Sequence, residues 1–355
     1  MEFCEKDKNG NWTFTTDEDF KVLQLTDVHI GGGFMSLKKD AMALNAVAAM
    51  IKAEQPDLVI ATGDVSYPVP FQAGTFNNLE SAKIFAALME QLGVYWTLGF
   101  GNHDTEAYSY YSREDISEFY SSEEFKYCLY TAGPDDVDGY GNQIINVKNS
   151  DGIITQSLYV FDSHSYTDGD YLGIFWKYDN IHENQVQWYK ENVIAYNEQN
   201  NALLKEMGKE ETSDIKSAAF FHIPLTEQRD AWYEYRDAGY QDTENVKLHY
   251  GVAGEGGNVV FCGMHEDNLF ETMLELGSTK AIFCGHDHVN DWAAIYEGIL
   301  LVYNQMGSYN AYSLGDFRGT SRPEEEWQQG VTLTTIHNDT TIDLKQSFNS
   351  RYLKK

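Results

Sequence analysis

Five short clusters of metal-ligating residue types are spread along this chain of 355 residues. They are Thr26-Asp27-Val28-His29, Gly63-Asp64, Asn102-His103-Asp104, His222 and His286-Asp287-His288. Cleavage of a phosphate ester needs a nucleophile made from water and positive charge to offset the phosphoryl oxygens. Two divalent ions about 4 Å apart supply both. Such a pair requires a bridging carboxylate with imidazole and oxygen ligands, and the five clusters contain these groups.

The spacing inside two of the clusters bears on how the side chains point. Asp27 and His29 are separated by one residue, as are His286 and His288. Alternate side chains of an extended backbone lie on the same side. We therefore expect each pair to present both of its side chains to one site.

A predicted strand precedes each of the first three clusters, and this arrangement places the three clusters at one edge of a sheet. Residues 21–25, 57–62 and 94–100 have strand composition, and helical spacing of apolar residues fills the two intervals between them. Alternating strands and helices favour a largely parallel sheet with right-handed crossovers. Ligand sites in such sheets lie beyond the carboxyl ends of the strands. The clusters that follow the three strands should therefore converge at one edge.

Later strands are expected to deliver the remaining clusters. Residues 217–221 precede His222 and residues 280–284 precede His286. A second sheet is predicted from strands at 293–296, 299–303, 331–336 and 341–344. We expect a single domain over residues 1–355, with residues from about 105 to 155 forming a tyrosine-rich cap over the site.

The five clusters together resemble the motifs of a known family. TDVH, TGD, GNHD, FFHIP and FCGHDH are similar to the D-x-H, G-D, G-N-H-[DE], H and G-H-x-H motifs of calcineurin-like metallophosphoesterases. Their flanks most resemble the purple-acid-phosphatase-like branch, and the resemblance covers about residues 20–315. It implies an α/β fold in which helices flank a two-sheet β-sandwich in four layers, α/β/β/α, with the metals at the carboxyl edge.

The resemblance also implies roles for individual residues. Two divalent or transition metal ions, Fe, Mn or Zn, are expected. The residues implied for the first ion are Asp27, His29 and His288; Asp64 bridges the two ions, and the second ion takes Asn102, His222 and His286. His103 is implied to lie near the phosphoryl group and to protonate the leaving oxygen. Asp104 is expected to accept the other ring proton of His103 and so orient it.

Two further residues are candidates for substrate contact. Gly63-Asp64-Val65-Ser66-Tyr67 matches the G-D-x-x-Y of purple acid phosphatases, whose tyrosinate binds iron, but those enzymes lack the histidine of D-x-H. We therefore interpret His29 as the ligand and Tyr67 as a residue of the substrate pocket, so that no purple colour is predicted. His164 is the other candidate, for which a surface or loop role is the alternative.

The predicted function is a metal-dependent phosphoesterase in which a metal-bridging hydroxide attacks a phosphomonoester or a small phosphodiester. The sequence leaves two alternatives open, a cyclic nucleotide phosphodiesterase and a non-catalytic metal-binding scaffold of the same fold. The substrate is expected to be a small phosphate ester or a phosphoprotein.

Composition disfavours two classes of partner. The net charge is −30, from 25 basic and 55 acidic residues, which disfavours nucleic acid and acidic membrane surfaces. No apolar run is long enough for a membrane span.

The four cysteines are scattered and are interpreted as free thiols. The polar first residues indicate no signal peptide, so a cytoplasmic location is the default expectation, and a trimmed secreted protein stays open.

Overall fold

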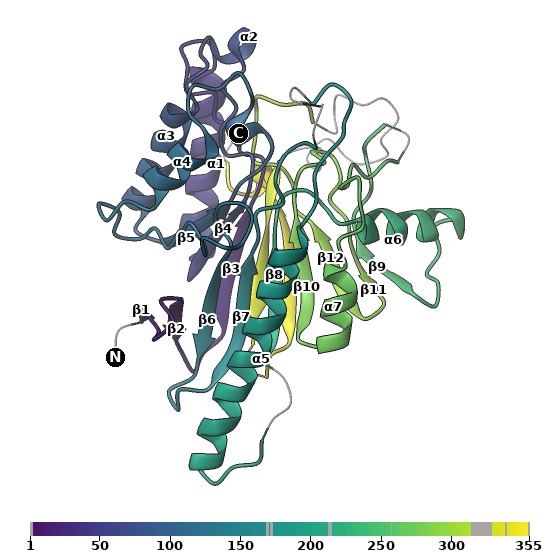
Figure 1. The fold of residues 1–355 in the computed structure, drawn as a ribbon. Coiled ribbons are helices and arrows are strands. Elements are labelled where there is room, and N and C mark those ends of the chain that lie inside the picture. The colour runs from purple at the N-terminus through teal and green to yellow at the C-terminus, as the bar shows by residue number, and fades with distance from the viewer. Residues whose placement is uncertain are drawn as a thin grey trace.

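A computed structural model describes residues 3–353 apart from 168–169, 171–172, 212–214, 257, 314–328 and 338. Two β-sheets pack face to face at its centre, and helices cover their outer faces (Figure 1). The smaller sheet has the order β14-β13-β3-β4-β5. Its parallel strands are β3 (Phe20–Leu25), β4 (Leu58–Thr62) and β5 (Tyr95–Gly99). The antiparallel strands β13 (Gly330–Ile336) and β14 (Ile342–Phe348) extend it.

Four helices form the first outer layer, three from the segments between the parallel strands and a fourth that follows β5. They are α1 (Leu37–Glu54), the short α2 (Pro70–Ala73), α3 (Asn78–Leu92) and α4 (Arg113–Tyr120). The Asn77 side chain caps α3 by accepting the Glu80 amide, and Gly93 ends it in the left-handed conformation. Apolar residues of α1, α3 and α4 share a buried cluster with β3, β4 and β5. The predicted strand–helix order of this half is confirmed.

The larger sheet contains nine strands in the order β1-β2-β6-β7-β8-β10-β12-β11-β9. Their bounds are β1 Cys4–Lys6, β2 Trp12–Thr15, β6 Gln143–Lys148, β7 Ile154–Val160, β8 Lys216–Phe220, β9 Val246–Tyr250, β10 Thr279–Cys284, β11 Ala293–Tyr296 and β12 Ile299–Tyr303. Strands β7, β8, β10 and β12 run parallel. The carboxyl ends of β8 and β10 therefore reach one edge together.

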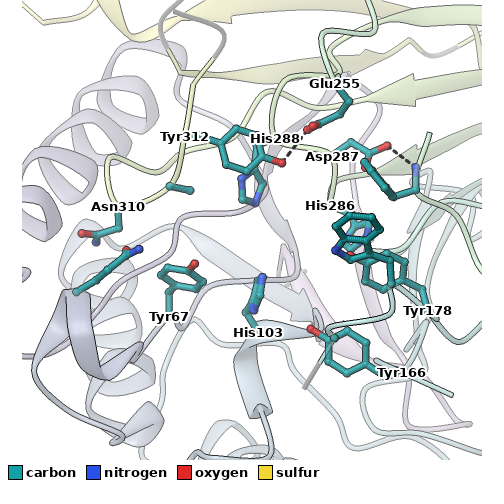
Figure 2. Close-up of a pocket in the computed structure, with 15 residues that line it drawn as sticks. Tyr67, His103, Tyr166, Tyr178, Glu255, His286, Asp287, His288, Asn310 and Tyr312 are labelled. Carbon is teal, nitrogen blue, oxygen red and sulfur yellow. Dashed lines mark hydrogen bonds between the residues drawn. The ribbon is translucent and has the colours of Figure 1, made fainter. Parts of the chain in front are cut away.

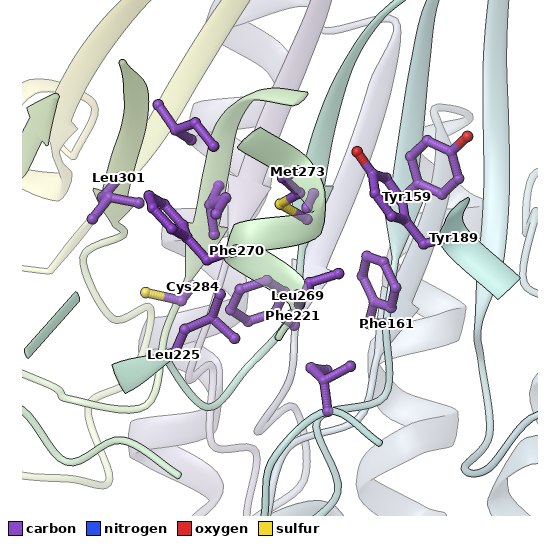
Figure 3. Packing of buried hydrophobic residues seen from close by; sticks show 14 of the residues in the cluster. Tyr159, Phe161, Tyr189, Phe221, Leu225, Leu269, Phe270, Met273, Cys284 and Leu301 are labelled. Carbon is purple, nitrogen blue, oxygen red and sulfur yellow. The ribbon is translucent and has the colours of Figure 1, made fainter. Parts of the chain in front are cut away.

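Three helices form the second outer layer, α5 (Glu183–Glu206), α6 (Thr226–Asp237) and α7 (Leu269–Leu276). Figure 3 shows Leu269 and Met273 of α7 with Phe161 and Phe221 of the same buried cluster. Cys284 belongs to this cluster, and all four cysteines are free, as predicted.

A third apolar cluster lies between the two sheets. It joins Val22 and Ile60 of the smaller sheet to Leu158, Phe220 and Phe283 of the larger one. The rings of Phe220 and Phe283 stack with their centroids 4.7 Å apart. The expected α/β/β/α layering is therefore confirmed.

One sequence prediction about this architecture is wrong. Residues 293–296 and 299–303 belong to the nine-stranded sheet, whereas the last two strands extend the sheet that carries β3. Within residues 105–155, β6 is a strand of the large sheet and α4 packs on the first helical layer, and the cap over the site stays a prediction. Strand pairing joins segments far apart in the chain, and local composition does not specify it. No helix in the described part of the chain is long and apolar enough to cross a membrane.

Candidate metal centre

The loops that follow five strands meet at the carboxyl edge of the sandwich. Asp27 and His29 follow β3, Asp64 follows β4, and Asn102 follows β5 just before the 3₁₀ helix His103–Thr105. From the other sheet, His222 follows β8, and His286 and His288 follow β10. A site at this edge draws on both sheets, so only the folded sandwich assembles it.

One group of donor atoms surrounds Asp27. His29 Nε2 lies 3.5 Å from Asp27 Oδ1 and 3.4 Å from Asp64 Oδ2. His288 Nε2 lies 3.4 Å from Asp27 Oδ1. One potential ligand atom from each of these four residues lies within 4.8 Å of those of the others.

A second group of donor atoms surrounds His222. Its Nε2 lies 3.1 Å from Asp64 Oδ2 and 3.1 Å from Asn102 Oδ1. His286 Nδ1 lies 3.3 Å from the same nitrogen. Asp64 Oδ2 thus belongs to both groups, and the structure brings all seven predicted ligands together. Metal binding by them stays a prediction.

The donor set fits metal ions on two counts. Asp27 Oδ1, Asp64 Oδ2 and His29 Nε2 are buried with no hydrogen-bond partner in the described structure. Buried polar atoms normally have partners, because burying them without one costs free energy. Two ligands on a tetrahedral ion with bonds of about 2.1 Å lie about 3.4 Å apart. The contacts between 3.1 and 3.5 Å are close to that spacing.

The electrostatics of the centre also favour cations. Burial alone would lower the pKa of His29, but the close carboxylates of Asp27 and Asp64 raise this pKa to about 9. His222 shows the same balance, and its pKa also rises to about 9. Burial, and then the neighbouring His222, hold the pKa of His286 well below its ordinary value. The carboxylates of Asp27 and Asp64 therefore attract positive charge to the centre. His286 is neutral there, and the neutral imidazole is the form that binds a metal.

The backbone of the site is strained, which corrects the expectation of an extended D-x-H segment. Asp27, His29, Asp64 and His286 have φ angles of 49, 51, 52 and 76°. A non-glycine residue in this left-handed region costs about 1–3 kcal/mol at functional sites. The Asp27 amide donates to Gly63 O and the His29 amide to Asp64 O, so the loops after β3 and β4 hold each other. Asp27 and His29 still meet, through left-handed turns instead of a pleat.

Asp104 does not orient His103, and this prediction is wrong. Its Oδ2 accepts the amides of Asp64 and Gly101, and its Oδ1 accepts the amide of Ser66. Burial, and then Asp64, raise the pKa of Asp104 to about 6. Asp104 thus fixes the loop that carries Asp64, and it forms no hydrogen bond with the imidazole of His103 in the described structure.

The carboxylate beside His103 is Glu106, a residue that the sequence analysis missed. Its Oε1 lies 2.7 Å from His103 Nδ1 and also accepts the hydroxyl of Tyr166 at 2.9 Å. Asn102 Nδ2 donates to the same hydroxyl at 2.9 Å. Glu106 is 6% exposed. The signal in the sequence was an acidic residue three positions after His103.

A cavity of about 570 Å³ opens beside the donor cluster (Figure 2). His103, His286 and His288 line it, and Tyr67 lines it too, with its ring stacked on that of His29 at a centroid distance of 4.4 Å. His164 is not part of the lining. It bonds Gln185 and stacks on His182, and its substrate contact stays a prediction.

The outer wall of the cavity comes from three loops that sequence patterns did not single out. The lining residues of these loops are Tyr166, Gly173, Trp176, Tyr178, Glu255, Phe261, Asn310, Ala311 and Tyr312. Glu255 accepts the Tyr312 hydroxyl at 2.9 Å, as Figure 2 shows. Burial raises the pKa of Glu255, and burial followed by the charge of Glu255 raises the pKa of Asp287 well above its ordinary value.

Comparison with known proteins places the chain in a family. The model of the calcineurin-like phosphoesterase family matches residues 20–290, and the chain belongs to that family. It is 28% identical over 364 residues to "Probable inactive purple acid phosphatase 28" of Arabidopsis thaliana, covering 96% of this chain and 83% of that protein. It is also 28% identical to "Phosphatase DCR2" of Saccharomyces cerevisiae, over 78% of this chain and 45% of the yeast protein.

A solved structure shares the fold. A dimetal phosphatase from Danio rerio superposes with a TM-score of 0.54 at 12% sequence identity, covering 94% of this chain and 97% of that one. At this identity the likeness extends to the fold alone, and it agrees with the two-sheet architecture described above.

Proposed function

We propose that this protein is a phosphoesterase that depends on two divalent metal ions. The observation that carries the proposal is the convergence of buried donor atoms with no hydrogen-bond partner, Asp27 Oδ1, His29 Nε2 and Asp64 Oδ2 among them, beside a cavity. Asp27, His29 and His288 would hold one ion, and Asn102, His222 and His286 the other, with Asp64 shared. Bound ions of this type neutralise phosphoryl charge and lower the pKa of water.

His103 is the candidate general acid. It lines the cavity, and its Nδ1 is engaged by Glu106, which leaves Nε2 as the nitrogen that can pass a proton to the departing oxygen. The Glu106 carboxylate fixes the tautomer with the proton on Nδ1 in the neutral ring. When the ring is protonated, Glu106 also stabilises its positive charge.

A small phosphate ester fits the site better than a nucleic acid. The cavity of about 570 Å³ accommodates a small ester. The net charge of −30 repels a long polyanion. Comparing the hydrolysis of mono-aryl and bis-aryl phosphates separates a monoesterase from a phosphodiesterase, including one that acts on cyclic nucleotides.

The main test uses two variants, His103→Ala and Asp64→Asn, and an activated aryl phosphate with added Mn²⁺. Asp64→Asn should lower both metal content and turnover, because the shared carboxylate is lost. His103→Ala should keep its metal and lose about a hundredfold in kcat, the lower end of general acid–base contributions. Turnover equal to the parent protein in either variant would refute the mechanism.

The rival proposal is a scaffold that binds metal without catalysis, and the word "inactive" in the name of the Arabidopsis relative gives it weight. A scaffold would bind metal and still show no turnover with any ester under Mn²⁺, Fe²⁺ or Zn²⁺. Metal analysis together with a substrate panel therefore separates the two proposals.

A further inference from the structure

The cavity wall beyond the metal ligands has an unusual chemical character for a site that receives phosphate. Six aromatic side chains line it, namely Tyr67, Tyr166, Trp176, Tyr178, Phe261 and Tyr312. Its acidic side chains are Glu255 and Asp287, and no lysine or arginine lines the part that the structure describes. The wall therefore offers π faces and carboxylates, the groups that bind an organic cation.

The aromatic faces border the metal ligands directly. The ring of Tyr312 lies 4.6 Å from that of His288, and the ring of Tyr178 lies 4.2 Å from that of His286, as centroid distances. Trp176 and Phe261 lie edge to face at 5.9 Å. A group bound against these rings can be only a few atoms away from a phosphate held at the metal centre.

The carboxylates of this wall are firmly placed. Glu255 is 6% exposed, and its Oε1 accepts the Tyr312 hydroxyl at 2.9 Å and the Val289 amide at 3.4 Å. Asp287 Oδ2 accepts the Tyr303 hydroxyl at 2.8 Å and the Phe261 amide at 3.2 Å. Neither carboxylate forms an ion pair with a lysine or arginine among the described residues. A cation in the cavity would lie beside the Glu255 carboxylate, which has no basic side chain to offset its charge among the described residues.

We propose that Glu255, Tyr312 and the facing aromatic rings form a subsite for an ammonium group, so that the substrate is the phosphate ester of a short amino alcohol. This inference rests on the proposed function for the position of the phosphate. The phosphate end lies at the metal centre, and the ammonium end lies against the Tyr312 face and the Glu255 carboxylate.

A pair of isosteric esters isolates the charge. Choline phosphate and 3,3-dimethylbutyl phosphate have nearly the same shape, and only the first carries the ammonium charge. We expect the Mn²⁺-loaded protein to favour choline phosphate by about tenfold in kcat/KM, in line with a desolvated cation–π contact beside a carboxylate. Equal values for the two esters, or a preference for the neutral one, would overturn the subsite.

Variants then assign the preference to residues. Glu255→Gln and Tyr312→Leu should each bring the ratio of the two kcat/KM values close to one. Tyr312→Phe keeps the π face and should retain most of the preference for choline phosphate. Glu210→Gln is the matched control, since it removes the same charge at an exposed position outside the cavity lining, and its ratio should equal that of the parent. A ratio that Glu255→Gln and Tyr312→Leu both leave unchanged refutes the assignment.

Binding of tetramethylammonium, measured by calorimetry on the metal-loaded protein, tests the subsite without turnover. Binding that Tyr312→Leu weakens supports it, even if no ester is hydrolysed and the proposed function fails. Hydrolysis of an aryl phosphate without tetramethylammonium binding would instead refute the subsite and leave the proposed function standing.

Discussion

At the scale of single residues, Glu106 makes the contact with the His103 imidazole that the sequence analysis predicted for Asp104. Asp104 is turned toward backbone amides, and Glu106 reaches the imidazole. Glu106 also accepts the hydroxyl of Tyr166, and that hydroxyl in turn accepts a hydrogen bond from Asn102. One buried carboxylate therefore links the candidate general acid to a candidate metal ligand.

The first prediction concerns Glu106→Gln. The amide can no longer stabilise a protonated His103, so protonation of the leaving oxygen should become harder. We expect kcat for an alkyl phosphate, whose leaving group needs a proton, to fall about tenfold or more, while kcat for an activated aryl phosphate falls much less. Steady-state kinetics with the two esters measures the difference.

Asp104→Asn is the matched control for Glu106→Gln. It alters the loop that carries Asp64, so it should affect metal content and both esters alike. Equal losses for both esters in Glu106→Gln would show that Glu106 serves folding or metal binding, and not the proton transfer.

The second prediction uses the tight packing behind Asp64. A Cβ atom at Gly101 would lie 2.1 Å from Asp64 Oδ1 and 2.4 Å from the Asp64 amide nitrogen. Gly101→Ala must therefore displace the shared carboxylate, and we expect the affinity for Mn²⁺ to fall at least tenfold, the lower end of losses caused by disturbing the groups that orient metal ligands. Titration of the apoprotein with Mn²⁺ measures this affinity.

Gly256→Ala, where a Cβ meets nothing within 4 Å, is the control. Parent-like affinity in Gly101→Ala would contradict the assignment of Asp64 as a ligand.

At the scale of elements, the sequence predicted best where periodicity is local. β3, α1, β4, α3 and β5 follow from alternating apolar runs, and the ligand clusters follow from their positions just after strands. The left-handed backbone of Asp27 and His29 did not follow, because it depends on hydrogen bonds between two loops. The outer cavity wall did not follow either, because Tyr166, Glu255 and Tyr312 come from irregular loops without a repeating pattern.

The third prediction belongs to the start of α5, where His182 bridges two segments. Its Nδ1 lies 2.7 Å from Asp138 Oδ2 and its Nε2 lies 3.5 Å from Asp179 Oδ1. The hydrogen bond to Asp179 is the largest cause of a pKa raised to about 9. A histidine whose pKa is raised on folding stabilises the fold fully below its unfolded pKa of about 6.5, and this contribution is lost as pH rises through about 9.

We therefore expect His182→Asn to lower the free energy of unfolding most at pH 6 and progressively less toward pH 10. Urea unfolding of both proteins across this range measures the difference. His265→Asn is the control, because that ring is exposed and has no ion pair among the described residues. A difference that grows with pH would contradict the two ion pairs.

At the scale of the whole molecule, the charge of the chain opposes its proposed chemistry. Its net charge of −30 repels an anionic ester at long range, while cations held by the seven proposed ligands would attract it only nearby. With these ions bound, the electrostatic field inside the cavity would have the opposite sign to the field outside it. Salt screens the outer field more strongly, because charges in a buried site are less exposed to counter-ions.

The fourth prediction follows from this difference in screening. Raising the ionic strength from about 0.01 M to about 0.15 M shortens the Debye length from about 30 Å to about 8 Å. We expect kcat/KM for a dianionic aryl phosphate to rise over this range, since its approach is less opposed, while kcat stays nearly constant. Choline phosphate has a smaller net charge, so its kcat/KM should rise less and provides the internal control. A fall in kcat/KM for the dianionic ester would mean that attraction by the metal centre already dominates at long range, and that the acidic surface does not control access to the site.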